Sequence, residues 1–108
     1  MGTAGTHSEP AERTLERVMT LTRDLLERAQ AGDWEDFPER QARRDAALHA
    51  LLDPEPRLPA ERLREPLAEL QAMDRQLIAL TESQRDRLQQ ELLQLMRGRK
   101  SARAYLGQ

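Results

Sequence analysis

The sequence has no cysteine and only three aromatic residues among its 108. Without cysteine, disulfide bonds and thiol chemistry are excluded. Val18 and Ile78 are the only valine and isoleucine, and this scarcity of β-branched residues disfavours a sheet. No apolar run approaches the length of a membrane span, and the start of the chain does not resemble a signal peptide. We therefore expect a cytosolic protein without a membrane span.

Motifs for catalysis and for metal binding are also missing. His7 lies among small and polar residues at the start of the sequence, while His49 has Asp45 and Asp53 one turn to either side. These three side chains are the one candidate for a metal-binding face, but a solvated helix face with local charge pairs explains them more simply. The sequence has no HExxH motif, no phosphate-binding glycine loop and no Cys/His cluster. We expect no enzymatic activity, no cofactor and no metal.

Charged residues make up 33% of the chain, with a net charge of −2, and they are unevenly distributed. Residues 1–59 sum to −4, whereas residues 97–108 sum to +4. The positive charge comes from Arg97, Arg99, Lys100 and Arg103. Favourable pairing with a helix C-terminus accounts for this cluster, although an acidic protein partner would use the same side chains. Since interleaved aromatic residues and a helix-turn-helix pattern are absent, we do not expect nucleic-acid binding.

The spacing of leucine residues predicts an all-α protein with a single domain over residues 1–108. We expect a disordered start at residues 1–8 and helices at about 9–31, 33–52 and 60–105. Because the connectors are short, these helices should form an antiparallel up-down-up three-helix bundle with a long C-terminal helix. The expected core residues are Leu15, Val18, Leu25, Trp34, Phe37, Leu48, Leu51, Leu70 and Leu77.

Several residues mark where these helices should begin or end. Ser8 is a candidate N-cap for the first helix, and Gly32 is suited to end it. Asp33 and Asp36 are both candidate caps for the second helix, and we favour a start at Asp33 that tightens or kinks at Pro38. Pro66 is expected to kink or delay the third helix. In its heptad seam Asp74, Thr81 and Gln84 are polar, a feature that can fix register in coiled coils.

The third helix outruns the other two, so part of its apolar stripe should stay uncovered by its own chain. Such a stripe suits a groove that accepts an amphipathic helix from another protein, and methionine adapts well to such surfaces. A homodimer that buries the same stripe is the alternative. The candidate groove residues are Leu80, Leu88, Leu92, Leu95 and Met96 of the third helix, with Met19 facing them from the first.

Four segments resemble the FliT family of flagellar export chaperones: LLERAQAGDW at residues 25–34, Met73-Asp74, RGR at 97–99, and Ala104-Tyr105. The resemblance spans about residues 12–106. It implies an all-α bundle that binds the C-terminal segment of the filament-cap protein, keeps that protein monomeric and presents it to the flagellar type III export apparatus. Some members of the family also bind the export ATPase or the flagellar master transcriptional regulator.

Within this resemblance, Tyr105 carries the family's Ala-Tyr signature and, with Arg99, is expected to contact a partner. The chain departs from the family at Pro38 and at Leu106, which follows the Ala-Tyr pair. Longer members also have a fourth helix that masks the binding surface, so autoinhibition is not carried over. We expect an export chaperone. The alternatives are a homodimeric coiled-coil structural or adaptor protein, and a regulator that binds a flagellar transcription factor through the basic end.

Overall fold

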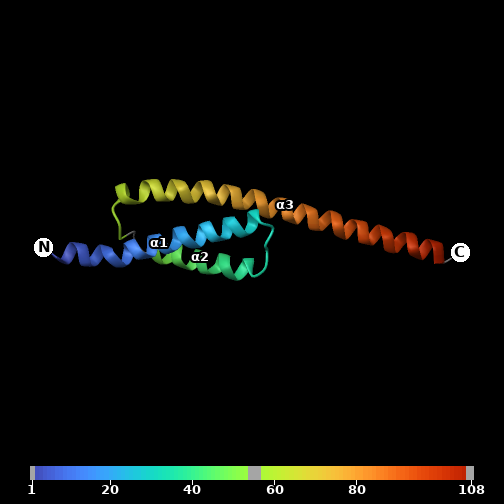
Figure 1. The fold of residues 1–108 in the computed structure, drawn as a ribbon, viewed down its shortest axis with the longest axis horizontal. Coiled ribbons are helices and arrows are strands. Elements are labelled where there is room, and N and C mark those ends of the chain that lie inside the picture. The colour runs from blue at the N-terminus through green and yellow to red at the C-terminus, as the bar shows by residue number, and fades with distance from the viewer. Residues whose placement is uncertain (1, 54–56, 107–108) are drawn as a thin grey trace. The chain divides into compact units, whose positions relative to one another are not determined.

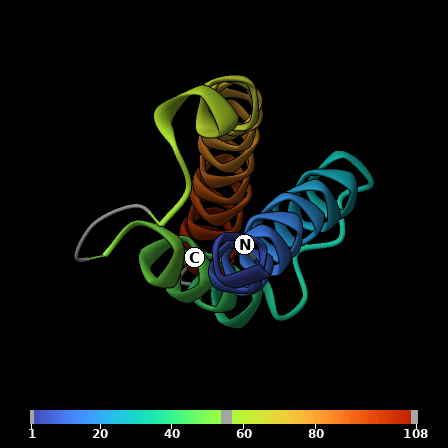
Figure 2. The same ribbon diagram turned by 90° about the vertical axis from the view of Figure 1, so that its left-hand side faces the viewer.

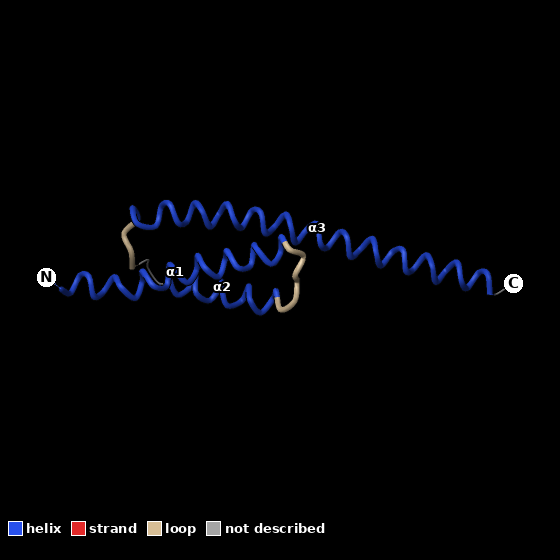
Figure 3. Tube along the Cα trace, in the orientation of Figure 1, coloured by secondary structure: helices blue, strands red, loops and turns tan. Residues whose placement is uncertain are grey.

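A computed structural model describes the backbone of residues 2–53 and 57–106. These residues form three helices, α1 (Gly2–Gln30), α2 (Phe37–Leu52) and α3 (Ala60–Leu106), and no strand (Figures 1 and 3). The all-α helical bundle predicted from the sequence is confirmed. The chain divides into two compact units, Met1–Leu77 and Ile78–Gln108, which are described separately below. None of the described helices has a stretch long and apolar enough to cross a membrane.

Helix α1 begins at Gly2, so Ser8 lies inside the helix and its predicted role as N-cap was wrong. Pro10 lacks one backbone N–H, but the loss of a single hydrogen bond does not end the helix here. At the other end, Gly32 adopts a left-handed conformation with φ +75°. Its N–H donates to the Ala29 carbonyl at 3.1 Å and the Asp33 N–H donates to the Arg28 carbonyl at 2.8 Å. This is a Schellman motif, which confirms Gly32 as the residue that ends α1.

Helix α2 begins at Phe37, so the predicted start at Asp33 was wrong. The Asp33 carboxylate instead accepts the Glu35 N–H at 3.2 Å, which holds the chain in a turn before the helix. Asp36 is the N-cap residue but adopts a left-handed conformation without a side-chain capping bond. Pro38 consequently falls in the first turn, where its missing N–H removes no helical hydrogen bond.

The corner between α1 and α2 carries the only two large aromatic rings whose side chains the structure describes. Trp34 and Phe37 meet edge to face, with ring centroids 5.1 Å apart. Both are half-buried, so their predicted place in the core was wrong. Trp34 lies in the turn and Phe37 is the first residue of α2, so the two rings pack against each other at the corner rather than in the core.

The core of the first unit combines apolar side chains from α1, α2, the first half of α3 and the preceding connector. Figure 2 shows the ribbons of α1 (blue) and α2 (green) nearly end on. Six predicted core residues are buried, while Leu48 is half-buried and packs against them. Thr22 is also fully buried, and its hydroxyl is tolerated there because it donates a hydrogen bond to the Val18 carbonyl at 2.7 Å. The six are Leu15, Val18, Leu25, Leu51, Leu70 and Leu77. The buried apolar residues outside the predicted core are Ala11, Met19, Ala29, Ala47, Leu58, Leu63 and Met73.

Helix α3 begins at Ala60, six residues before Pro66, so the predicted delay at this proline did not occur. Leu63 and Leu70, one turn to either side of Pro66, are both buried in the core. Their burial holds the helix together across the hydrogen bond that the proline removes. The Arg62 guanidinium also donates to both oxygens of the Glu12 carboxylate at 2.8 and 2.7 Å, which ties the start of α3 to α1.

Candidate partner-binding surface

The described part of the second unit is the helical segment 78–106, and most of its large apolar side chains are exposed to solvent. Among the described residues, all buried apolar side chains belong to the first unit, and all exposed large ones belong to the second. Exposed fractions run from 50% for Leu93 to 81% for Leu106. An exposed apolar surface of this kind indicates a site for another molecule. The exposed set is Ile78, Leu88, Leu92, Leu93, Leu95, Met96 and Leu106.

Most of these side chains lie along one side of the helix. An α-helix turns by about 100° per residue, so positions separated by three or four residues share a face. Leu88, Leu92 and Leu95 follow this spacing, and Met96 stands beside Leu92. We call these four residues the apolar stripe. Leu93 lies about 100° round the helix from Leu92, on the side away from Leu88 and Leu95, and is not part of it.

The structure places the predicted groove residues in different environments. The four members of the apolar stripe are exposed by 53–66%. Leu80 is half-buried. Met19 is only 6% exposed and belongs to the core of the first unit, so the prediction that it offers an exposed groove wall was wrong. It follows Val18 and lies one turn after Leu15, on the inner face of α1, and that position explains its burial.

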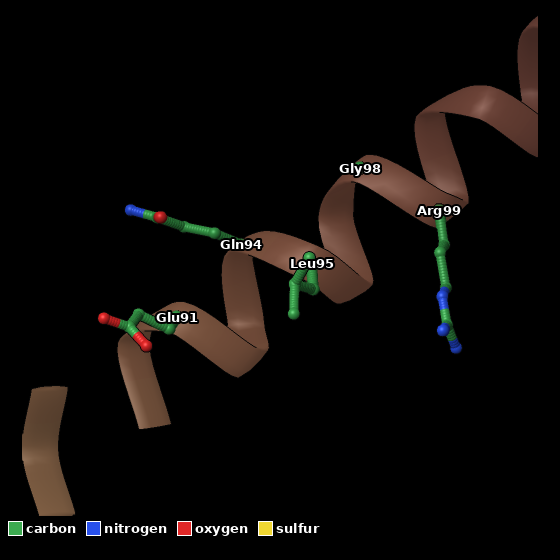
Figure 4. A pocket seen from close by; sticks show the side chains of 5 residues that line it. All are labelled: Glu91, Gln94, Leu95, Gly98 and Arg99. Carbon is green, nitrogen blue, oxygen red and sulfur yellow. The ribbon is translucent and has the colours of Figure 1, made fainter. Parts of the chain in front are cut away.

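Two further predicted contact residues lie near the end of α3. Arg99 is exposed and points away from the helix beside Leu95 (Figure 4). Tyr105 belongs to α3 by its backbone, but its side chain lies outside the described residues. The structure therefore provides a position for the Arg99 side chain alone.

Gly98 creates a hollow in the surface of the helix next to the apolar stripe. The hollow has a volume of about 630 Å³ and is lined by Glu91, Gln94, Leu95, Gly98 and Arg99. Figure 4 shows the four side chains around it, with none at Gly98. From the sequence alone this glycine indicates only a weak point in the helix, and its role in shaping a surface was missed.

The second unit is positively charged. Residues 78–108 contain six basic and three acidic residues, a net charge of +3, whereas residues 1–77 carry −5. In the described part of the second unit one ion pair forms, between Arg87 and Glu91 at 3.4 Å. The side chains of Arg97, Arg99, Lys100 and Arg103 are all exposed. These four cations form no ion pair among the described residues, so they are available to an acidic surface of another protein.

A smaller cleft lies within the first unit, but its charges are already paired. It has a volume of about 380 Å³, with Leu15, Met19 and Pro66 among its lining residues. At its rim the Arg23 guanidinium donates to the Glu69 carboxylate at 3.1 Å. The other rim cation, Arg62, is bound by Glu12, as described above. This cleft offers a ligand less unpaired charge and less apolar surface than the stripe does.

The remaining polar clusters tie elements of the first unit together. The Arg28 guanidinium lies 3.1 Å from Asp24 and 3.0 Å from Asp33, and the hydrogen bond to Asp24 is the main cause that raises the pKa of Arg28. The His49 imidazole lies 3.5 Å from the Asp53 carboxylate, and both side chains are exposed. Among the described residues, no group of three or more His, Asp or Glu side chains is placed to hold a metal ion.

Comparison with known proteins agrees with the resemblance seen in the sequence. The sequence model of a protein family described as "Flagellar protein FliT" matches residues 12–108. The matched range contains α2, α3 and most of α1. No curated protein and no solved structure matches the chain.

Proposed function

Because the chain belongs to the FliT family of flagellar proteins, we propose that it is an export chaperone for the flagellar filament-cap protein. In this proposal it binds the C-terminal segment of the cap protein and prevents premature assembly. It then delivers the cap protein to the flagellar type III export apparatus. Nothing in the described residues supports catalytic activity, so the proposed role is binding alone.

The observation that carries this proposal is the exposed apolar stripe. Leu88, Leu92 and Leu95 stand at the spacing at which a helix presents one face to a partner. Each is more than half exposed, so its transfer from water into an interface would favour binding by the hydrophobic effect. An amphipathic cargo helix with apolar residues at i, i+3 or i+4, and i+7 would complement this surface.

The basic end of α3 supports a second contact in the same role. Arg99 and the neighbouring cations are exposed and would attract an acidic surface. We propose that Arg99 and Tyr105 contact the export ATPase or the flagellar master regulator once cargo is bound. If so, an Arg99→Glu variant should still bind cargo in solution while export of the cap protein in cells falls. Equal loss of cargo binding and of export would assign Arg99 to the cargo surface.

Calorimetric titration with a synthetic peptide of the cap protein's C-terminal segment tests the main proposal. Leu88→Asp and Leu92→Asp place a charge on the stripe and should abolish binding. Gln90→Asp adds the same charge on the opposite side of the helix and should bind like the unmodified protein. All three should keep their helicity by circular dichroism. Unfolding of both stripe variants would instead make Leu88 and Leu92 structural residues, and normal binding by both would exclude the stripe as the cargo site.

A homodimeric coiled coil is the second candidate, because the same exposed stripe would also fit another copy of the chain. Thr81 and Gln84 continue the heptad seam towards Leu88 and are both half-buried. Polar residues at such positions lower the stability of a coiled coil but can specify its register. This candidate predicts a dimer that does not respond to cap-protein peptides.

A further inference from the structure

The hollow beside Gly98 has the geometry that receives one side chain from a neighbouring helix. Glu91, Gln94, Leu95 and Gly98 stand at positions i, i+3, i+4 and i+7 of α3. Four residues with this spacing form the hole into which a side chain of the facing helix inserts in coiled coils. An ordinary hole has four side chains around it, but here Gly98 contributes none (Figure 4). The hole is therefore open on one side and fits a large side chain.

Neither backbone conformation nor crowding requires glycine at position 98. Gly32 is the one described glycine with positive φ, so Gly98 has the backbone of an ordinary helical residue. No atom lies within 4 Å of the position that a Cβ would occupy there. Glycine is also the poorest helix former after proline. The residue weakens the helix without easing any contact in the chain itself, which suggests that the space it leaves is used by another molecule.

A second hole lies on the other flank of the apolar stripe. Met96, Arg99, Lys100 and Arg103 repeat the same i, i+3, i+4, i+7 spacing, and three of the four carry positive charge. At about 100° per residue, Gly98 and Arg103 lie on opposite sides of the line through Leu88, Leu92 and Leu95. The surface thus has an apolar centre, an open hole at Gly98 on one flank and a positively charged hole on the other.

We propose that the hole at Gly98 is the anchor subsite for the bound cargo helix. It takes one large apolar side chain, such as leucine, methionine or phenylalanine, while acidic side chains of the same helix pair with Lys100 and Arg103. The choice of an acidic amphipathic helix follows from charge complementarity, since both cations are exposed and form no ion pair among the described residues. The inference rests on the proposed function, because the occupant is the cap protein's C-terminal segment.

Substitutions of Gly98 test the subsite, with the cap-protein peptide as the probe. Gly98→Ala should raise the helicity of the protein and yet weaken peptide binding. Gly98→Leu fills the hole completely and should weaken binding by roughly tenfold or more, as expected for loss of a buried anchor. Ser83→Ala improves helix propensity outside both holes, and Gln90→Leu adds the same bulk on the side of the helix opposite the apolar stripe. Both controls should bind like the unmodified protein.

A scan of the peptide then identifies the anchor side chain. Alanine replaces each large apolar residue of the peptide in turn, and one replacement should weaken binding to the unmodified protein but not to Gly98→Leu. Glutamine in place of the peptide's acidic residues should weaken binding to the unmodified protein and have little effect on binding to a Lys100→Gln/Arg103→Gln variant. Such paired losses are the signature of direct contact in a double-mutant cycle.

The outcomes distinguish this inference from the proposed function. If the unmodified protein does not bind the peptide, the export-chaperone proposal is wrong and the subsite falls with it. If it binds while Gly98→Ala and Gly98→Leu bind equally well or more tightly, the hole is not a subsite and the chaperone proposal stands. If replacing the peptide's acidic residues by glutamine weakens binding equally for the unmodified protein and the double glutamine variant, the positively charged hole does not bind acidic side chains. The proposed pairing would then be wrong.

Discussion

The Arg44 guanidinium donates to the Asp74 carboxylate at 2.7 Å and joins α2 to α3 inside the first unit. The Arg44 side chain is only 7% exposed, and its Nε also donates to Asp45 at 2.9 Å. A buried guanidinium is tolerated when it is paired and hydrogen-bonded, but it destabilises the fold when its partner is removed. The polar residue that the heptad pattern places at position 74 therefore has a specific partner across the bundle.

This pair predicts unequal effects for the two carboxylates around Arg44. Asp74→Ala leaves the buried guanidinium without its partner on α3 and should lower the free energy of unfolding by roughly 1–3 kcal/mol. Asp45 is 58% exposed and adjacent to Arg44 in sequence, so Asp45→Ala should change stability by less than about 0.5 kcal/mol. Urea denaturation measures both values. Equal losses would mean that the contact with Asp74 adds nothing specific to the bundle.

Gly32 and Gly98 should respond oppositely to alanine. Gly32 needs φ +75°, which costs an L-residue roughly 1–2 kcal/mol, so Gly32→Ala should lower the melting temperature. Gly98 has open space around it in an ordinary helix, so Gly98→Ala should stabilise that helix by roughly 0.5–1 kcal/mol. Circular dichroism during heating reports both changes. A shift of the same sign for both variants would contradict the assigned backbone conformations.

Leucines of the two units should differ sharply in their contribution to stability. Leu25 is 1% exposed, so Leu25→Ala should cost roughly 2–5 kcal/mol through lost burial and the cavity left behind. Leu92 is 57% exposed, so Leu92→Ala should alter stability by less than about 0.5 kcal/mol. Chemical denaturation of the isolated variants decides this. A large loss at Leu92 would show that this residue is buried in solution by an assembly of the chain with itself.

Self-association provides the test between chaperone and coiled coil. If the stripe serves both purposes, a second copy and a cargo helix compete for one surface. Sedimentation at low micromolar concentration, with and without the cap-protein peptide, should show saturable peptide binding and loss of any dimer that shares the stripe. A tight dimer that does not respond to the peptide would favour the structural coiled coil instead.

Much of the first unit could be predicted from the sequence, because its signals are local. Leucine spacing revealed the three helices, and Gly32 marked the end of α1 since its left-handed conformation is one that glycine adopts easily. Helix starts were less predictable. Pro10 and Pro66 both lie inside helices, where the surrounding structure compensates for one missing hydrogen bond. The start of α2 depended on whether Asp33 would cap a helix or a turn, and the sequence allowed both.

The candidate site was predictable only in part, because exposure depends on which faces the folded chain covers. Helix length and leucine spacing predicted an uncovered apolar surface on α3, and four of the six predicted groove residues, those of the apolar stripe, are exposed. Met19 has the same apolar character as Met96, but its position on the inner face of α1 buries it. The burial of Arg44 depends on Asp74, thirty residues away, so no local pattern indicates it. The hole at Gly98 depends on a missing side chain, which periodicity does not detect.

Hydrogen exchange of the protein, measured with and without the cap-protein peptide, tests whether residues 78–106 present a face that binds the cargo helix. Peptide binding should slow amide exchange over residues 84–103, because a bound partner suppresses local opening of that helix. Exchange in the core around Leu25 should change little. Protection confined to residues 1–77, with none over residues 84–103, would contradict the account.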